Sequence, residues 1–430
     1  MATDNQNKNL LKTIGPGLLF ASTAIGTSHL VLSTRAGAHH GMIFFWIILA
    51  TLLLKYPFYE FGPRYAIATG DSLIKGYKKQ GNWAVLLFLA VIFFNMFAVT
   101  GAVGAVTAGL LKTLIGLDLS MPLLLGIVLT GTVGLLLLGG YTALDNFIKL
   151  LSLVLLVTVS TAFFAVLMKG QLEPVVDFKA PNLIEGAGLA LLVSLIGWMP
   201  SGLEASTMNS IWVVEKMKAT NYKPTLKESL FDFNLGYGFT TVLALMFLTI
   251  GAFTVYGSGQ LLEGNATQFS NKLLTIFTTN LGQWSYWIIA IAAFGTIYGT
   301  LITILDAFTR SFVRGLLALN HQSMSALEKQ ANLSRNYKIL LPILALGGFA
   351  LFYFSAASMV KILEYATILG FLTSPIIAFL NIRAITSVDV TAEFRPSRRM
   401  LNLAYVGLIA IVLFAIYYVT TLFQNGLGSH

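Results

Sequence analysis

Two short segments of this chain combine residues that break helices with residues that could bind an ion. Residues 26–29 read Gly-Thr-Ser-His, and residues 199–204 read Met-Pro-Ser-Gly-Leu-Glu. Proline and glycine interrupt helical hydrogen bonding and leave backbone groups free. We therefore predict a substrate-binding site built from Gly26, Thr27, Ser28, His29, Met199, Pro200, Ser201 and Gly202.

Each segment also contributes one titratable side chain, His29 in the first and Glu204 in the second. A carboxylate inside a membrane is costly and is rarely without a function, and histidine binds a proton near physiological pH. We predict that both residues bind the coupling ion, Na+ or H+. A structural alternative stays open for each: Ser201 and Glu204 match a capping box, and His29 could bind freed carbonyls of the other segment.

Further polar residues are expected along the helices that hold these segments. Arg35 follows the first segment by one or two helical turns and is predicted to act in gating or in an entry path for anions. Thr367 and Thr373 are predicted to line the pathway, although hydrogen bonds between helices explain most threonines inside membranes.

Charged residues inside the apolar runs are few. Glu60 with Arg64, and Asp306 with Arg310, are spaced four residues apart and are predicted to pair along one helix face. Lys55 lies deeper in the same run as Glu60, and the sequence assigns it no partner.

The composition places these residues in a membrane. The chain has 430 residues, of which 56% are hydrophobic and 10% are charged, and its mean hydropathy is +0.78. A soluble domain carries about 25% charged residues. The absence of cysteine excludes disulfides and thiolate metal sites. No phosphate-binding GxxxxGK[ST] motif is present, so we expect no use of ATP.

The apolar runs predict an all-α polytopic membrane protein with eleven spans, because each run is long enough to cross a hydrocarbon core of about 30 Å. No cleavable signal peptide is expected. The predicted spans cover residues 14–38, 41–66, 83–111, 120–140, 146–168, 187–213, 231–256, 284–315, 338–356, 361–383 and 400–423.

The basic residues predict the orientation of these spans. The net charge is +9, and most of the 27 lysines and arginines fall in alternate loops, including Lys75, Lys78 and Lys79. Such loops face the cytoplasm. We expect a protein of the inner (plasma) membrane with a cytoplasmic N-terminus and an external C-terminus. The same reasoning makes nucleic acid an unlikely partner for the positive charge.

The two helix-breaking segments fall in spans one and six. Two inverted five-helix repeats would place them there, and paired interruptions of this kind indicate the site of a secondary transporter. We expect a single transmembrane domain over residues 1–430, with one repeat at about 14–168, a second at about 187–383 and an extra span at about 400–423.

Several motifs resemble those of the NRAMP family of divalent-metal transporters. They are Gly15-Pro16-Gly17, Ala36-Gly37-Ala38 with Gly41, residues 68–73 (Ala-Thr-Gly-Asp-Ser-Leu), and Met199-Pro200. The resemblance covers essentially the whole membrane domain. It implies a LeuT-type fold and proton-coupled uptake of manganese or iron.

The binding segments depart from the family pattern. The family has Asp-Pro-Gly-Asn where this chain has residues 26–29, so Gly26 replaces the metal-binding Asp and His29 replaces the Asn. Ser201 and Gly202 stand where the family has His and Asn. The family's acidic residue in span three falls near Thr100, which therefore becomes a candidate for the coupling-ion site. The family's Ala-Gly-Gln stretch in span eight is not recognisable.

These losses shift the expected substrate away from a bare metal ion, which needs charged or strong oxygen and nitrogen ligands. Hydroxyls, a histidine and the exposed amides of half-helices suit a small oxyanion. We predict bicarbonate as substrate, coupled to Na+ or H+, with no other cofactor and no confident metal ligand. The expected partners are this small inorganic ion and the lipid bilayer, and we expect a monomer.

Two other readings stay open. Glu204, His29 and Met199 could form a remodelled site for a divalent metal ion such as Mn2+, Mg2+ or Fe2+. A receptor or sensor built on a transporter scaffold is the second alternative, although no signalling domain is appended. An enzyme is not expected, because no Ser/His/Asp set or cluster of histidines and carboxylates is recognisable.

Overall fold

The computed structural model describes residues 12–116, 118–138, 141–175, 178–259, 262, 266–320, 326–355 and 359–425. Side chains of residues 141–152, 266–267, 326–332 and 360 lie outside that description. The described part of the chain is helical and contains no β-strand. The fold class expected from the apolar runs is therefore confirmed.

The helices follow one another with short connections. They are α2 (Pro16–Ala24), η1 (Thr27–Ser33), α3 (Thr34–His40), α4 (Ile43–Thr69), α5 (Leu73–Gln80), α6 (Asn82–Ile115), α7 (Met121–Leu138), α8 (Tyr141–Lys169), α9 (Gly186–Trp198), α10 (Ala205–Thr220), α11 (Leu226–Thr254), α12 (Ala266–Leu281), η2 (Gln283–Ser285), α13 (Tyr286–Leu319), α14 (Ala326–Ser355), α15 (Met359–Ile385), η3 (Ala392–Phe394) and α16 (Arg398–Asn425).

Within the described residues, nine helical segments are long and apolar enough to cross a membrane. They coincide with nine of the eleven predicted spans. The other two predicted spans correspond to α8 and to the pair α9 and α10. Span five is thus one helix, whereas span six is divided into two.

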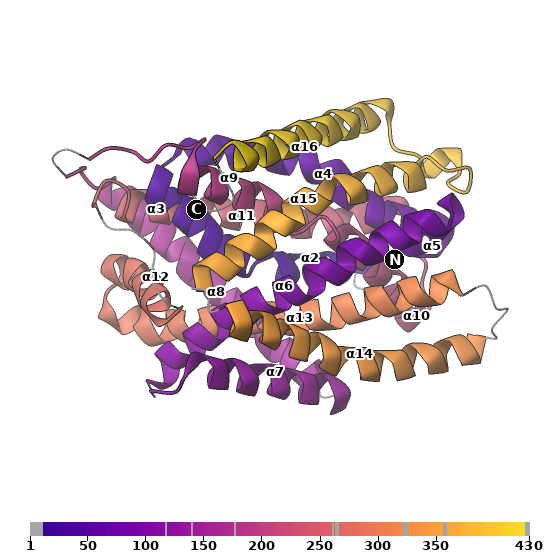
Figure 1. Cartoon of the computed structure of the whole chain (residues 1–430), viewed down its shortest axis with the longest axis horizontal. Coiled ribbons are helices and arrows are strands. Elements are labelled where there is room, and N and C mark those ends of the chain that lie inside the picture. The colour runs from indigo at the N-terminus through magenta and orange to yellow at the C-terminus, as the bar shows by residue number, and fades with distance from the viewer. Residues whose placement is uncertain are drawn as a thin grey trace, which may run out of the picture.

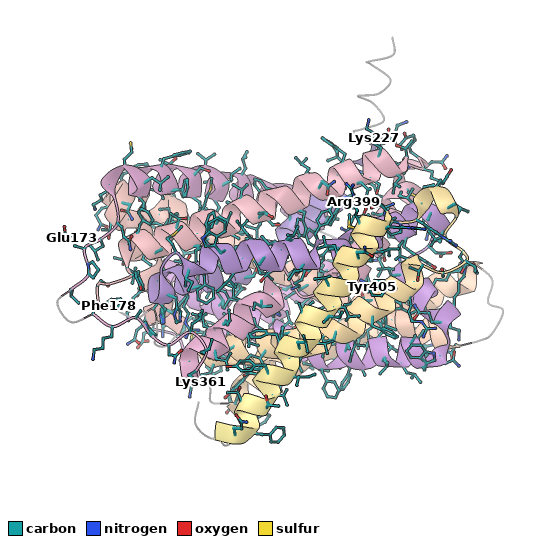
Figure 2. The ribbon with its side chains drawn as sticks, turned by 90° about the horizontal axis from the view of Figure 1, so that it is seen from above. Glu173, Phe178, Lys227, Lys361, Arg399 and Tyr405 are labelled. Carbon is teal, nitrogen blue, oxygen red and sulfur yellow. The ribbon has the colours of Figure 1, made fainter. Side chains whose placement is uncertain are left out.

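The bundle has a buried centre and a lipid-accessible periphery. In the most apolar stretch of the segment from α2 to α3, 83% of the residues are buried. The corresponding share is only 22% in α14 and 17% in α16. Figure 1 shows α7 and α14 side by side at one edge of the bundle and α16 along the opposite edge. In Figure 2, α16 crosses the face of the bundle and carries Tyr405. The first interrupted span therefore lies in the buried centre of the bundle.

Both predicted interruptions are present. The first span runs as α2, a break at Ile25 and Gly26, the π-helical segment η1, and α3. The sixth span runs as α9, a break over residues 199–204, and α10. Backbone groups at such breaks need partners inside the protein, because lipid offers none.

The Gly-Pro-Gly motif at the start of α2 allows a close approach to α11. A Cβ atom on Gly17 would overlap the backbone carbonyl of Asp232. The Asp232 carboxylate accepts hydrogen bonds from the backbone N–H of Gly15 at 3.0 Å and of Gly17 at 2.7 Å. These amides belong to the first turn of α2, which has no partners inside its own helix. Asp232 thus caps α2 from a neighbouring helix.

Candidate functional site

A small cavity lies between the two breaks. Its volume is about 40 Å³, enough for roughly three water molecules. Side chains from both interrupted spans and from α6 and α13 line it: Thr23, Thr27, Ser28, Val99, Val103, Trp198, Ser201, Gly202, Glu204, Ala205, Met208, Thr300, Ile304 and Phe308. Five of the predicted site residues, Thr27, Ser28, Ser201, Gly202 and Glu204, therefore meet at this cavity.

Ser28 links the two breaks directly. Its hydroxyl oxygen lies 2.6 Å from the carbonyl oxygen of Ala24 and 3.2 Å from that of Pro200, so its one proton is shared among neighbouring acceptors. The same oxygen lies 2.8 Å from Nδ1 of His29. A carbonyl freed by the second break is thus bound by a side chain from the first.

His29 lies behind this link and is fully buried. Its Nε2 lies 3.0 Å from the carbonyl oxygen of Thr240 on α11. A ring nitrogen must carry hydrogen to donate to a carbonyl, so Nε2 is the protonated nitrogen and Nδ1 faces Ser28. His29 thus ties the first break to α11 and does not line the cavity.

Lys55 of α4 binds the end of α9. Its Nζ donates to the carbonyl oxygens of Ile196 at 3.0 Å, Gly197 at 2.9 Å and Ser201 at 3.3 Å. The hydroxyl of Tyr59, one turn further along α4, also donates to Ser201. These contacts satisfy the carbonyls that the second break leaves free.

Glu204 directly precedes α10 and its side chain is buried. The predicted capping box is wrong: α10 begins at Ala205, and no side chain caps it. The carboxylate instead folds back over Gly202, where a Cβ atom would overlap one of its oxygens. It lies close enough to Lys55 for the two charges to attract. Glu204 is therefore free to present its carboxylate to the cavity.

Gly26 cannot be replaced by a larger residue without a clash. A Cβ atom there would overlap the hydroxyl oxygen of Thr300 on α13. That hydroxyl donates to the carbonyl of Ser22 at 3.0 Å. Thr300 thus occupies the space in which a side chain at position 26 would begin.

The remaining predicted site residues lie around the cavity without lining it. Met199 and Thr100 are fully buried, and Thr100 packs against Gly348 of α14. Thr367 of α15 donates to carbonyls of its own helix, Leu363 and Glu364. Thr373 accepts a hydrogen bond from Asn95 at 3.0 Å. None of the four is brought to the cavity. Thr100 and Thr373 contact neighbouring helices, and Thr367 bonds within its own helix.

The predicted charge pairs are confirmed. Arg64 donates to Glu60 on the same helix at 2.9 Å, and Arg310 donates to Asp306 at 2.7 Å. The pathway residue Arg35 is buried and pairs with a carboxylate on α15.

Several residues of the site were not predicted. Thr23, Trp198, Met208 and Thr300 line the cavity, but nothing in the sequence distinguishes them from other residues of apolar helices. Lys55 did carry a signal, because a lysine in the middle of an apolar run needs a partner at that depth. Its partners are backbone carbonyls, which no side-chain pattern reveals.

The site lacks the ligands of a typical metal centre. Among the residues that the structure describes, no three His, Asp or Glu side chains gather closely enough to hold a metal ion. The cavity itself offers one carboxylate, hydroxyls and one thioether.

The arrangement of interrupted first and sixth spans matches solved transporters. The fold aligns with a variant of the manganese transporter of Eremococcus coleocola, with a TM-score of 0.70, 14% identity and coverage of 98% of this chain and 89% of that chain. It also aligns with MhsT in complex with L-phenylalanine, with a TM-score of 0.62, 14% identity and coverage of 93% and 98%. These similarities show that the chain has the LeuT fold.

Sequence comparison places the chain within that class. The model of the natural resistance-associated macrophage protein-like (Nramp) family matches residues 17–421. An uncharacterized protein of Pasteurella multocida is 31% identical over 94% of this chain and 91% of its own length. The metal transporter Nramp6.2 of Populus trichocarpa is 26% identical over 69% of this chain and 55% of its own. This chain belongs to the NRAMP family.

Proposed function

We propose that this NRAMP-family protein is a secondary transporter of a small oxyanion, with bicarbonate as the best candidate. In this proposal Glu204 binds the coupled cation, H+ or Na+. The observation that carries the proposal is a pair of buried hydrogen-bond donors on residues that line the cavity: the hydroxyl of Thr27 and the indole N–H of Trp198, whose nitrogen lies beside Gly370 of α15.

Both donors lack a partner among the described residues. Thr27 and Trp198 are 2% and 6% exposed, line the cavity, and leave Oγ1 and Nε1 without a hydrogen-bond partner. An indole nitrogen can only donate, so it cannot ligate a metal ion. An unpaired buried donor costs about 1–3 kcal/mol. An oxyanion in the cavity would relieve that cost at both groups.

The surrounding charges support an anion once Glu204 is neutralised. Ala205, the first residue of α10, lines the cavity, so the positive end of that helix faces it. Lys55 places a positive charge on the other side of the break. A proton or Na+ on Glu204 removes the repulsion between its carboxylate and an arriving anion. Anion and cation would therefore bind together, which is the basis of symport.

The divalent-metal alternative is supported by the relatives, which include a manganese transporter and a plant metal transporter. Two features of this chain disfavour it. Thr300 fills the space that a side chain at position 26 would need, where the resemblance implies the family's metal-binding carboxylate. Among the described residues, Glu204 supplies the one carboxylate that lines the cavity, and one carboxylate is few for a dehydrated divalent ion.

Uptake by proteoliposomes separates the two substrates. We expect saturable uptake of labelled bicarbonate, driven by a pH or Na+ gradient, and no saturable uptake of Mn2+. Trp198→Phe removes a hydrogen bond to a charged group and should raise the KM for bicarbonate about tenfold. Trp46→Phe is the matched control, because Trp46 is 71% exposed on α4. Saturable Mn2+ uptake that bicarbonate does not affect would refute the proposal.

We further propose that the protein works as a monomer in the plasma membrane, with the N-terminus in the cytoplasm. The charge distribution supports this orientation. Figure 2 shows Lys227 and Arg399 toward one end of the bundle, whereas Glu173 and Phe178 lie at the other end. Basic residues favour the cytoplasmic side. A reporter fused to the C-terminus should be active only if it functions outside the cytoplasm, and activity of a cytosol-dependent reporter would contradict this topology.

A further inference from the structure

The environment of Lys55 is that of a bound cation. The side chain is 1% exposed, and its Nζ has three carbonyl oxygens within 3.3 Å, from Ile196, Gly197 and Ser201. The ring of Tyr59 lies on another side, with its centroid 5.7 Å from Nζ. Carbonyl oxygens and an aromatic face are groups that bind monovalent cations.

The three carbonyls and the Tyr59 ring form a cage around Nζ of Lys55. The place of this cage in the fold explains why it favours a positive charge. Two of the carbonyls belong to the last turn of α9, which ends at Trp198. The C-terminal end of a helix carries partial negative charge. The third carbonyl, from Ser201, belongs to the break itself. Glu204 stands at the end of the same break, directly before α10. An empty cage of this kind would attract a cation from solution.

We propose that the ammonium of Lys55 is a tethered substitute for a monovalent cation of the Na+ or K+ class at the end of α9. The wild-type protein then needs no free Na+ or K+ at the second break. This inference refines the proposed function, on which it rests in one respect: it leaves the proton as the ion that couples at Glu204.

Other carbonyls of the second break are already engaged. The carbonyl of Pro200 accepts from Ser28 at 3.2 Å. Those of Gly202 and Leu203 accept from backbone amides of the first turn of α10 at 3.0 and 3.1 Å. With these and the Lys55 contacts in place, the break offers a free Na+ few carbonyl ligands beside Glu204.

Removal of the Lys55 ammonium should allow the cage to bind a free Na+ or K+ ion. Lys55→Ala or Lys55→Ser leaves the three carbonyls and the charge of Glu204 in place and opens room between them. We expect the melting temperature of either variant to rise saturably with NaCl or KCl relative to choline chloride. The wild type, Lys55→Arg and the surface control Lys169→Ala should show no such difference.

A transport assay is the second part of the test. Wild-type uptake of labelled bicarbonate at constant pH should be unchanged when choline replaces Na+ and K+, whereas the Lys55→Ser variant should recover activity only when one of these ions is present. The melting arm does not depend on the substrate, so a failure of bicarbonate uptake would refute the proposed function alone.

Two results would overturn the inference itself. The first is a requirement of the wild type for Na+ or K+, either for uptake or for its melting temperature, and this result remains decisive if neither small variant folds. The second is a folded Lys55→Ala or Lys55→Ser protein that does not distinguish Na+ and K+ from choline.

Discussion

The guanidinium of Arg35 on α3 forms an ion pair with the carboxylate of Glu364 on α15, 329 residues further along the chain. The side chains are only 5% and 18% exposed. α3 continues the half-helix that starts at the first break, whereas α15 packs along α9 of the sixth span. The pair therefore connects the half-helix that follows the first break to α15, the helix that packs on α9.

Loss of this pair should loosen that end of the bundle. Glu364→Gln removes the charge of the carboxylate that pairs with Arg35, and breaking a buried ion pair costs about 3 kcal/mol or more. We expect a lower melting temperature for the purified protein. The exposed pair of Lys75 and Asp71 is the control, and Asp71→Asn should cost less than about 1 kcal/mol.

The same variant should also make the cavity more accessible. The native chain has no cysteine, so a single cysteine introduced as Thr23→Cys reports the cavity without background. Labelling by an impermeant maleimide from the predicted outer side should be faster with Glu364→Gln than without it. Equal rates would show that the pair does not act as a gate.

The close approach of Gly26 and Thr300 predicts that a larger residue at position 26 destabilises the protein. Gly26→Ala forces a methyl group against the Thr300 side chain, and overpacking of this kind costs about 1–3 kcal/mol. Thr300→Ala in the same chain should recover most of the lost stability in thermal melting. Gly131→Ala is the control, because no atom lies within 4 Å of a Cβ atom added there. Additive effects of the two substitutions would contradict the contact.

The hydrogen bonds of His29 predict a third effect. His29→Leu keeps most of the volume but removes the hydrogen bond to the Thr240 carbonyl, at a cost of about 0.5–1.5 kcal/mol. His29→Gln retains a donor and an acceptor and should lose less. Melting of the two variants gives the comparison, together with bicarbonate uptake. A leucine variant as stable and active as the wild type would exclude a role for His29 between the first break and α11.

The cap on α2 predicts a fourth effect. Asp232→Ala removes the acceptor for the amides of Gly15 and Gly17, and unpaired buried amides cost about 1–3 kcal/mol each. Hydrogen exchange of the first turn of α2, measured by mass spectrometry, should become faster. Asp118→Ala should not change it, because Asp118 is exposed and pairs with Lys112 at 3.2 Å, far from α2 in the sequence. Unchanged exchange in the Asp232 variant would show that the cap does not hold this turn.

The sequence alone determined the membrane class, the two interrupted spans and the family. A segment that crosses lipid must be apolar and must satisfy its backbone hydrogen bonds as a helix. Both properties depend on local sequence, so apolar runs locate the spans. Residues 26–29 and 199–204 contain glycine or proline within such runs, so both breaks could be located before any contact was known. The pairs of Glu60 with Arg64 and of Asp306 with Arg310 were equally predictable, because a helix fixes the distance between residues four positions apart.

Only the tertiary structure decided which polar groups meet. Thr300 is 274 positions from Gly26 along the chain, and only the packing of α13 on α2 makes it exclude a side chain there. Likewise, the carbonyls that hold Lys55 come from a helix about 140 residues away. Thr100, which the resemblance made a candidate for the coupling-ion site, packs against Gly348 of α14. Contacts between distant helices depend on how the helices cross, and single-sequence periodicity carries no information about that geometry.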